Sequence, residues 1–131
     1  MKIDNYIYSF SNASITLRVM EYLSKKQLPL ESVAVINLID RWLVQVKMKD
    51  ILPTKLAKDV KAFLDEMGIQ DKPSAKVKMA LAQLEAGICP TEVMNRYRVV
   101  IVAYGQPEKK EVEIFREQIV ERLGYCPQNM A

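Results

Sequence analysis

The residue types available for chemistry are limited, because the 131-residue chain contains no histidine. Imidazole is the commonest metal ligand and the usual proton carrier near neutral pH. A serine or cysteine nucleophile would therefore need a lysine, a carboxylate or a metal ion to activate it. Ser74 and Cys89 lie in no motif of an activated nucleophile, and no Asp/Asn/Gly loop of the calcium-binding type is present. The sequence predicts a protein without catalytic activity, cofactor or metal.

Cys89 is the candidate nucleophile of our third and weakest hypothesis, a small enzyme. It lies between Ile88 and Pro90, close to the predicted end of a helix. Free cysteines are among the most buried residue types, so we expect Cys89 to fill space in the core. The acidic pair Asp65 and Glu66 lies opposite the apolar stripe of its helix and is expected to be solvated.

Basic side chains are frequent in two predicted helices, over residues 54–67 and 75–86. The lysines concerned are Lys55, Lys58, Lys61, Lys76 and Lys78. Together they could contact phosphates, while Tyr6 and Tyr8 of the first strand could stack against bases. A nucleic-acid-binding protein is therefore our second hypothesis, although the net charge is only +3 and the usual strand signature of RNA-binding sheets is missing.

Aromatic side chains of the kind enriched in protein interfaces occur at Trp42, Tyr104 and Tyr125. A small sheet often has an exposed edge, which pairs with another chain unless it is protected. Our leading hypothesis is a non-catalytic, regulatory module that binds another protein or a second copy of itself. The sheet edges and the last helix are the candidate surfaces for a homodimer.

The elements that must position these residues begin with a strand over 5–10, where the aromatic residues Tyr6, Tyr8 and Phe10 occupy every second position. Ser11 or Asn12 can cap a helix that ends at about Lys26. Between residues 32 and 49, β-branched side chains favour two strands joined by a tight turn at Asp40-Arg41. One long helix through residues 32–49 is the alternative, and it would make the fold mostly α.

The second half of the chain is predicted to be largely helical. Apolar residues recur at helical spacing over 54–67, before Gly68, and again over 75–86, where Asp71 or Ser74 can cap the helix and Gly87 can end it. Residues 88–95 receive no assignment. Residues 97–104 are apolar on both faces, which is typical of a central strand. A last helix is predicted from Pro107 to Gly124.

This order of elements predicts one α+β domain over residues 1–131. We expect a four-stranded antiparallel or mixed sheet with helices packed on it, in a ferredoxin-like split βαβ arrangement with an extra helix. The apolar runs are too short to cross a bilayer, and no secretory signal is recognisable. The spacing of Cys89 and Cys126 suits free thiols, so we expect a cytoplasmic protein.

Overall fold

The computed structural model describes residues 5–26, 28–38 and 40–105, together with Glu113 and Glu117. In chain order the elements are β1 (Asn5–Phe10), α1 (Ala13–Lys25), β2 (Leu30–Asn37), β3 (Trp42–Met48), α2 (Thr54–Met67), β4 (Ile69–Gln70), α3 (Ala75–Glu85), α4 (Pro90–Tyr97) and β5 (Val100–Gly105). The predicted α+β class is confirmed. The predicted number of four strands is wrong, because the described part of the chain forms five.

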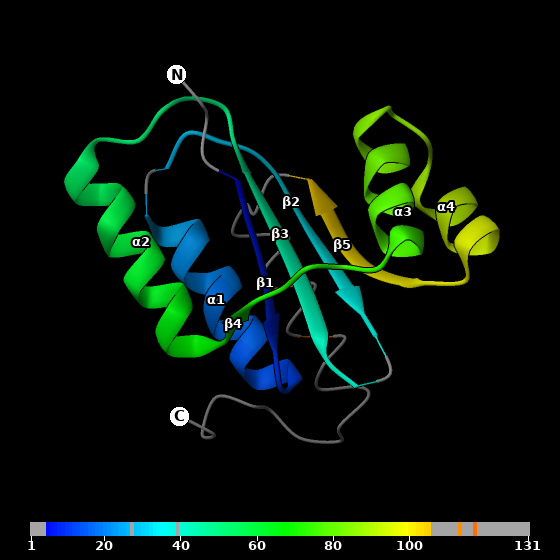
Figure 1. The fold of residues 1–131 in the computed structure, drawn as a ribbon, viewed down its shortest axis with the longest axis horizontal. Helices are drawn as coiled ribbons and strands as arrows, with labels where there is room; N and C mark the ends of the chain where they lie inside the picture. The colour runs from blue at the N-terminus through cyan, green and yellow to red at the C-terminus, as the bar shows by residue number, and fades with distance from the viewer. Residues whose placement is uncertain (1–4, 27, 39, 106–112, 114–116, 118–131) are drawn as a thin grey trace.

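The five strands form one open sheet in the order β4-β1-β3-β2-β5 (Figure 1). Each neighbouring pair runs antiparallel, so the alternative of a mixed sheet does not apply to the described strands. The β2–β3 hairpin confirms the two strands predicted between residues 32 and 49, and the single long helix is wrong. The amide of Leu38 donates to the carbonyl of Arg41 at 2.8 Å and closes the turn.

Helices cover both faces of this sheet, because large apolar side chains alternate between the two faces along each strand. On the first face, Tyr8 and Phe10 of β1 pack with the α1 and α2 side chains. On the second face, Ile36 of β2 and Leu43 of β3 pack with the α3 and α4 side chains. Figure 1 shows these helix pairs on opposite sides of the sheet. Helices α2 and α3 follow each other in the sequence but belong to different cores.

Capping residues define the ends of the helices. Asn12 caps α1, its side chain accepting from the amide of Ile15 at 2.9 Å. Ser74 caps α3. The unassigned segment contains α4, which begins at Pro90, where a missing amide and a fixed φ are tolerated. Gly87 has a φ of 92°, so its lack of a side chain is required where the chain leaves α3.

Strand β5 begins at Val100, so the predicted strand over 97–104 started too early, and Tyr97 belongs to α4. Among the described strands β5 pairs only with β2, which places it at an edge instead of the predicted centre. Its register with β2 shifts between Val35 and Ile36, which marks a β-bulge. As a result Ile101 and Tyr104, which are three residues apart, both pack against the second core.

The last predicted helix, from Pro107 to Gly124, lies outside the described residues apart from Glu113 and Glu117. These two glutamates are helical and exposed.

Gly68 ends α2 for a steric reason. Its φ of −161° is extended, which any residue can adopt, and its amide donates to the carbonyl of Leu64 at 2.9 Å. A side-chain carbon at this position would collide with the carbonyl oxygen of Ser9 and the ring of Phe10. The absence of a side chain therefore lets the chain pass close to β1 before it forms β4.

We predict that Gly68→Ala lowers the free energy of unfolding by about 2 kcal/mol or more, because a methyl group would be forced into filled space. Urea denaturation followed by circular dichroism measures this change. Glu66→Ala, on the exposed surface of the same helix turn, should change the free energy of unfolding by less than about 0.5 kcal/mol. Equal effects of the two substitutions would contradict the steric account.

Candidate functional site

The lysines proposed as one nucleic-acid surface lie on two different faces of the molecule. All five are exposed. Lys55, Lys58 and Lys61 belong to α2, which packs on the first core, whereas Lys76 and Lys78 belong to α3, which packs on the second. The sheet therefore separates the two groups (Figure 1). The prediction of a combined patch on neighbouring helices is wrong.

The two tyrosines proposed as stacking residues also differ in accessibility. Tyr8 is only 1% exposed and its hydroxyl donates a hydrogen bond to Asp65 on α2. A nucleobase cannot reach this ring in the folded protein, so Tyr8 is wrong as a stacking residue. Tyr6 is half-buried and packs against the same core.

Asp65 is exposed, as the sequence predicted, and it also joins β1 to α2. It accepts from Tyr8 and, at 2.9 Å, from the ammonium group of Lys61. Both hydrogen bonds lower the pKa of Asp65, and the hydrogen bond from Lys61 has the larger effect. Burial and the hydrogen bond to Asp65 raise the pKa of Tyr8 above its ordinary value of 10.0.

The aromatic residues proposed for a protein interface do not form one surface. Trp42 is half-buried and packs against the first core, whereas Tyr104 packs against the second. Tyr125 lies outside the described residues. Cys89 precedes α4 and is exposed, so the expectation that it fills space in the core is wrong. In the part of the chain that the structure describes, no group of three or more acidic or cysteine residues is arranged to hold a metal ion.

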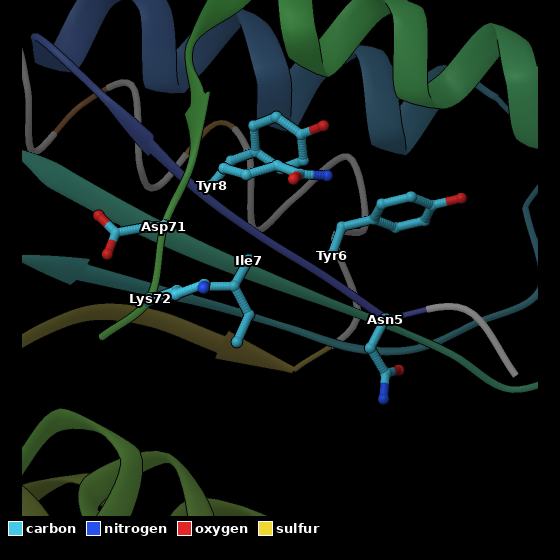
Figure 2. A pocket seen from close by; sticks show the side chains of 7 residues that line it. Asn5, Tyr6, Ile7, Tyr8, Asp71 and Lys72 are labelled. Carbon is cyan, nitrogen blue, oxygen red and sulfur yellow. The ribbon is translucent and has the colours of Figure 1, made fainter. Parts of the chain in front are cut away.

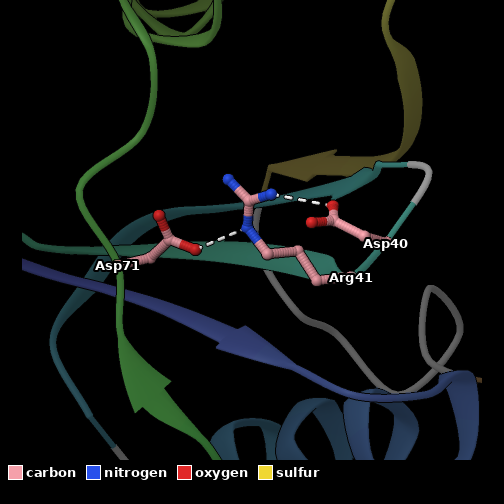
Figure 3. A network of polar contacts seen from close by, with 3 residues as sticks. All are labelled: Asp40, Arg41 and Asp71. Carbon is pink, nitrogen blue, oxygen red and sulfur yellow. Dashed lines mark hydrogen bonds and ion pairs between the residues drawn. The ribbon is translucent and has the colours of Figure 1, made fainter.

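After β4 the chain crosses the second face of the sheet to reach α3. An ion pair holds the crossing segment to the sheet (Figure 3). The Arg41 Nε donates to Asp71 at 2.7 Å, and its Nη1 donates to Asp40 at 2.8 Å. The side chain of Asp71 is only 8% exposed. The hydrogen bond to Asp71 raises the pKa of Arg41.

Because β4 ends early, the first residues of β1 pair with β3 on one side but have no described strand on the other. Ile69 and Gln70 pair with Ser9 and Tyr8, and the last contact is the amide of Asp71 donating to the carbonyl of Ile7 at 2.9 Å. Figure 2 shows β1 continuing past this point to Asn5 while the chain turns away across the sheet.

Two cavities lie along this unpaired stretch and share three lining residues, Asn5, Tyr6 and Gln70. We call the combined surface the β1 edge site. The cavity on the first face has a volume of about 410 Å³, and the cavity that includes Ile7 has a volume of about 640 Å³. The other residues lining the first are Leu52, Thr54, Ala57, Lys58 and Lys61, and those lining the second are Ile7, Tyr8, Asp71 and Lys72.

This site could not be predicted from the sequence, because β4 has only two residues. The sole sequence signal is the short Gly68-Ile69-Gln70 stretch between two helical patterns. Comparison with protein-family models, with curated proteins and with solved structures finds no match. Within the described residues, no helix combines the length and apolar composition needed to cross a membrane.

We predict that Arg41→Met destabilises the protein by about 1–3 kcal/mol, because the buried Asp71 carboxylate loses its charged donor. Urea denaturation at pH 7 measures the change. The double variant Arg41→Met/Asp71→Asn should recover part of the loss, since no unpaired charge then remains. A double variant that is as unstable as the sum of the two single variants would contradict this role of the ion pair.

We predict that stability falls as the pH rises above about 10, and that Tyr8→Phe reduces this fall. The raised pKa keeps Tyr8 protonated in the folded state at a pH where the unfolded state, with a pKa near 10.0, loses its proton. Ionisation therefore stabilises the unfolded state. Urea denaturation between pH 9 and 11 measures the slope for both proteins, and identical slopes would contradict the prediction.

Proposed function

We propose that this protein is a non-catalytic module that binds another protein chain by adding an extended segment to the β1 edge site. One observation carries the proposal. Backbone groups point alternately to the two sides of a strand, so those of Asn5 and Ile7 face away from β3. No described residue is hydrogen-bonded to the backbone of Asn5 or to the amide of Ile7 on that side. An added strand would satisfy these groups.

The surroundings of the edge support the same proposal. An added strand places its side chains alternately on the two faces, and two cavities along this edge offer space for them. Leu52, Ala57 and Tyr6 supply apolar surface on the α2 side. Beside the site, the side chain of Ile69 is 70% exposed, which is unusual for a large apolar residue.

Two further proposals concern the fold family and the cellular location of the protein. We infer that β1 to β4 with α1 and α2 form a ferredoxin-like core of two split βαβ units, which α3, α4 and β5 extend. The strand order β4-β1-β3-β2 supports this inference. We also propose that the protein acts in the cytoplasm, and the free, exposed thiol of Cys89 supports a reducing compartment.

The nucleic-acid alternative loses its main support, since Tyr8 is buried and the two lysine groups lie on different faces. The hypothesis of an enzyme with Cys89 as nucleophile gains no support. No described side chain forms a hydrogen bond or ion pair with the Cys89 thiol that could activate it.

We predict that decapeptides selected from a random display library against the protein will bind at the β1 edge site. In nuclear magnetic resonance titrations, the amide signals of Asn5 and Ile7 should shift, and their hydrogen exchange should slow. Asn5→Pro removes an outward amide without touching the bonds to β3, and should weaken binding about tenfold. Asn5→Ala keeps the amide and serves as the matched control.

Thermal denaturation should show that both Asn5 variants remain folded. Selected peptides that bind equally well to the proline variant, or that shift amides on another surface, would refute the proposed function. Selection of no peptide at all would also refute it.

A further inference from the structure

We propose that the natural occupant of the β1 edge site is an acidic extended segment of a different protein. This inference rests on the proposed function and adds the chemistry of the partner. It follows from the charges around the site and not from the backbone edge itself.

The residues that line the two cavities carry three lysines and a single carboxylate. Lys58 and Lys61 belong to α2. Lys72 belongs to the crossing segment and is shown in Figure 2. The carboxylate is that of Asp71, which is almost fully buried and already paired with Arg41. An incoming strand therefore meets positive charge on both faces.

Two of these ammonium groups are available to a partner. Lys61 is bound to Asp65 within α2. By contrast, the side chains of Lys58 and Lys72 have no hydrogen bond or ion pair with any residue between 5 and 105 that the structure describes, and both are exposed. Adjacent residues of a strand point to opposite faces, so two consecutive acidic residues of a partner can meet Lys58 and Lys72 at the same time.

The same charges disfavour a second copy as the occupant. A homodimer formed through this edge would be isologous, with each residue facing the same surface of its partner. Lys58 and Lys72 of both copies would then crowd around one pair of strands, and like charges across paired strands are destabilising. A partner that supplies carboxylates turns this repulsion into attraction.

The probe for this inference is a capped decapeptide of threonine and valine with two adjacent glutamates at its centre. A second decapeptide carries glutamines in place of the glutamates. Nuclear magnetic resonance titration at low salt gives the dissociation constants of both. We expect the glutamate peptide to bind about fivefold more tightly, with the difference shrinking in 0.5 M sodium chloride.

The protein variant for this test is the double substitution Lys58→Glu/Lys72→Glu. Its matched control is Lys76→Glu/Lys78→Glu, which changes the net charge equally at exposed positions of α3, on the other core. The first variant should reverse the preference between the two peptides, and the control should retain it. Thermal denaturation checks that both variants fold.

The possible results separate this inference from the proposed function. If both decapeptides bind equally and Asn5→Pro weakens both, the edge binds a strand but the acidic preference is wrong. If the preference survives Lys58→Glu/Lys72→Glu, the inference is overturned as well. Sedimentation that shows a dimer lost on Asn5→Pro would identify a second copy as the occupant and would also overturn it.

Discussion

The need to cover both faces of one small sheet determines most of this structure. Every long strand places large apolar side chains on both sides, so one helix layer would leave half of them in water. The chain uses α1 and α2 for one face and α3 and α4 for the other. It must therefore pass from the first face to the second, and it does so directly after Gln70. The brevity of β4 and the exposed stretch of β1 both result from that crossing.

Polar contacts of Asp71 hold the crossing segment in place, and the missing side chain of Gly68 lets the chain approach the sheet closely. Gly68 brings the chain against Phe10, the amide of Asp71 binds the carbonyl of Ile7, and the Asp71 carboxylate binds Arg41 at the end of the hairpin. A buried carboxylate is tolerated because a guanidinium compensates the loss of water. The ion pair thus fixes the path of the chain between two cores that share only the sheet.

Periodicity was sufficient to predict the longer helices and strands of the first 86 residues. The alternation over 5–10, the β-branched residues of the hairpin and the apolar stripes of α2 and α3 each reflect burial on a defined side. The sequence could not indicate β4 or its relation to β1, because pairing of two residues leaves no periodic trace. It also misplaced β5, since a strand at an edge can be apolar on both faces when a core lies on each.

The candidate site could be predicted only in part for the same reason, because the sequence does not indicate which segments lie side by side. The sequence singled out the lysines of α2 and the tyrosines of β1, but it could not show their neighbours, which depend on the face of the sheet that each helix covers. Tyr8 proved to be inside the first core, and Lys76 and Lys78 lie over the second. Of that group, Tyr6, Lys58 and Lys61 line the edge site, and Tyr8 lines it with a ring that is almost fully buried. No pattern of residue types in the sequence indicates that the backbone groups of Asn5 are exposed.

Because β5 contains a bulge, the two outermost described strands of the sheet, β4 and β5, differ in the regularity of their backbones. The extra residue of the bulge twists the strand and interrupts the regular spacing of amides and carbonyls on the outer side. A regular strand from a neighbouring molecule would find poor complementarity there, and this is a common means by which proteins resist uncontrolled fibre growth. Under the proposed function, the described sheet would have one irregular edge and one edge that accepts a strand, so it could bind a single partner segment without forming a continuous array of copies.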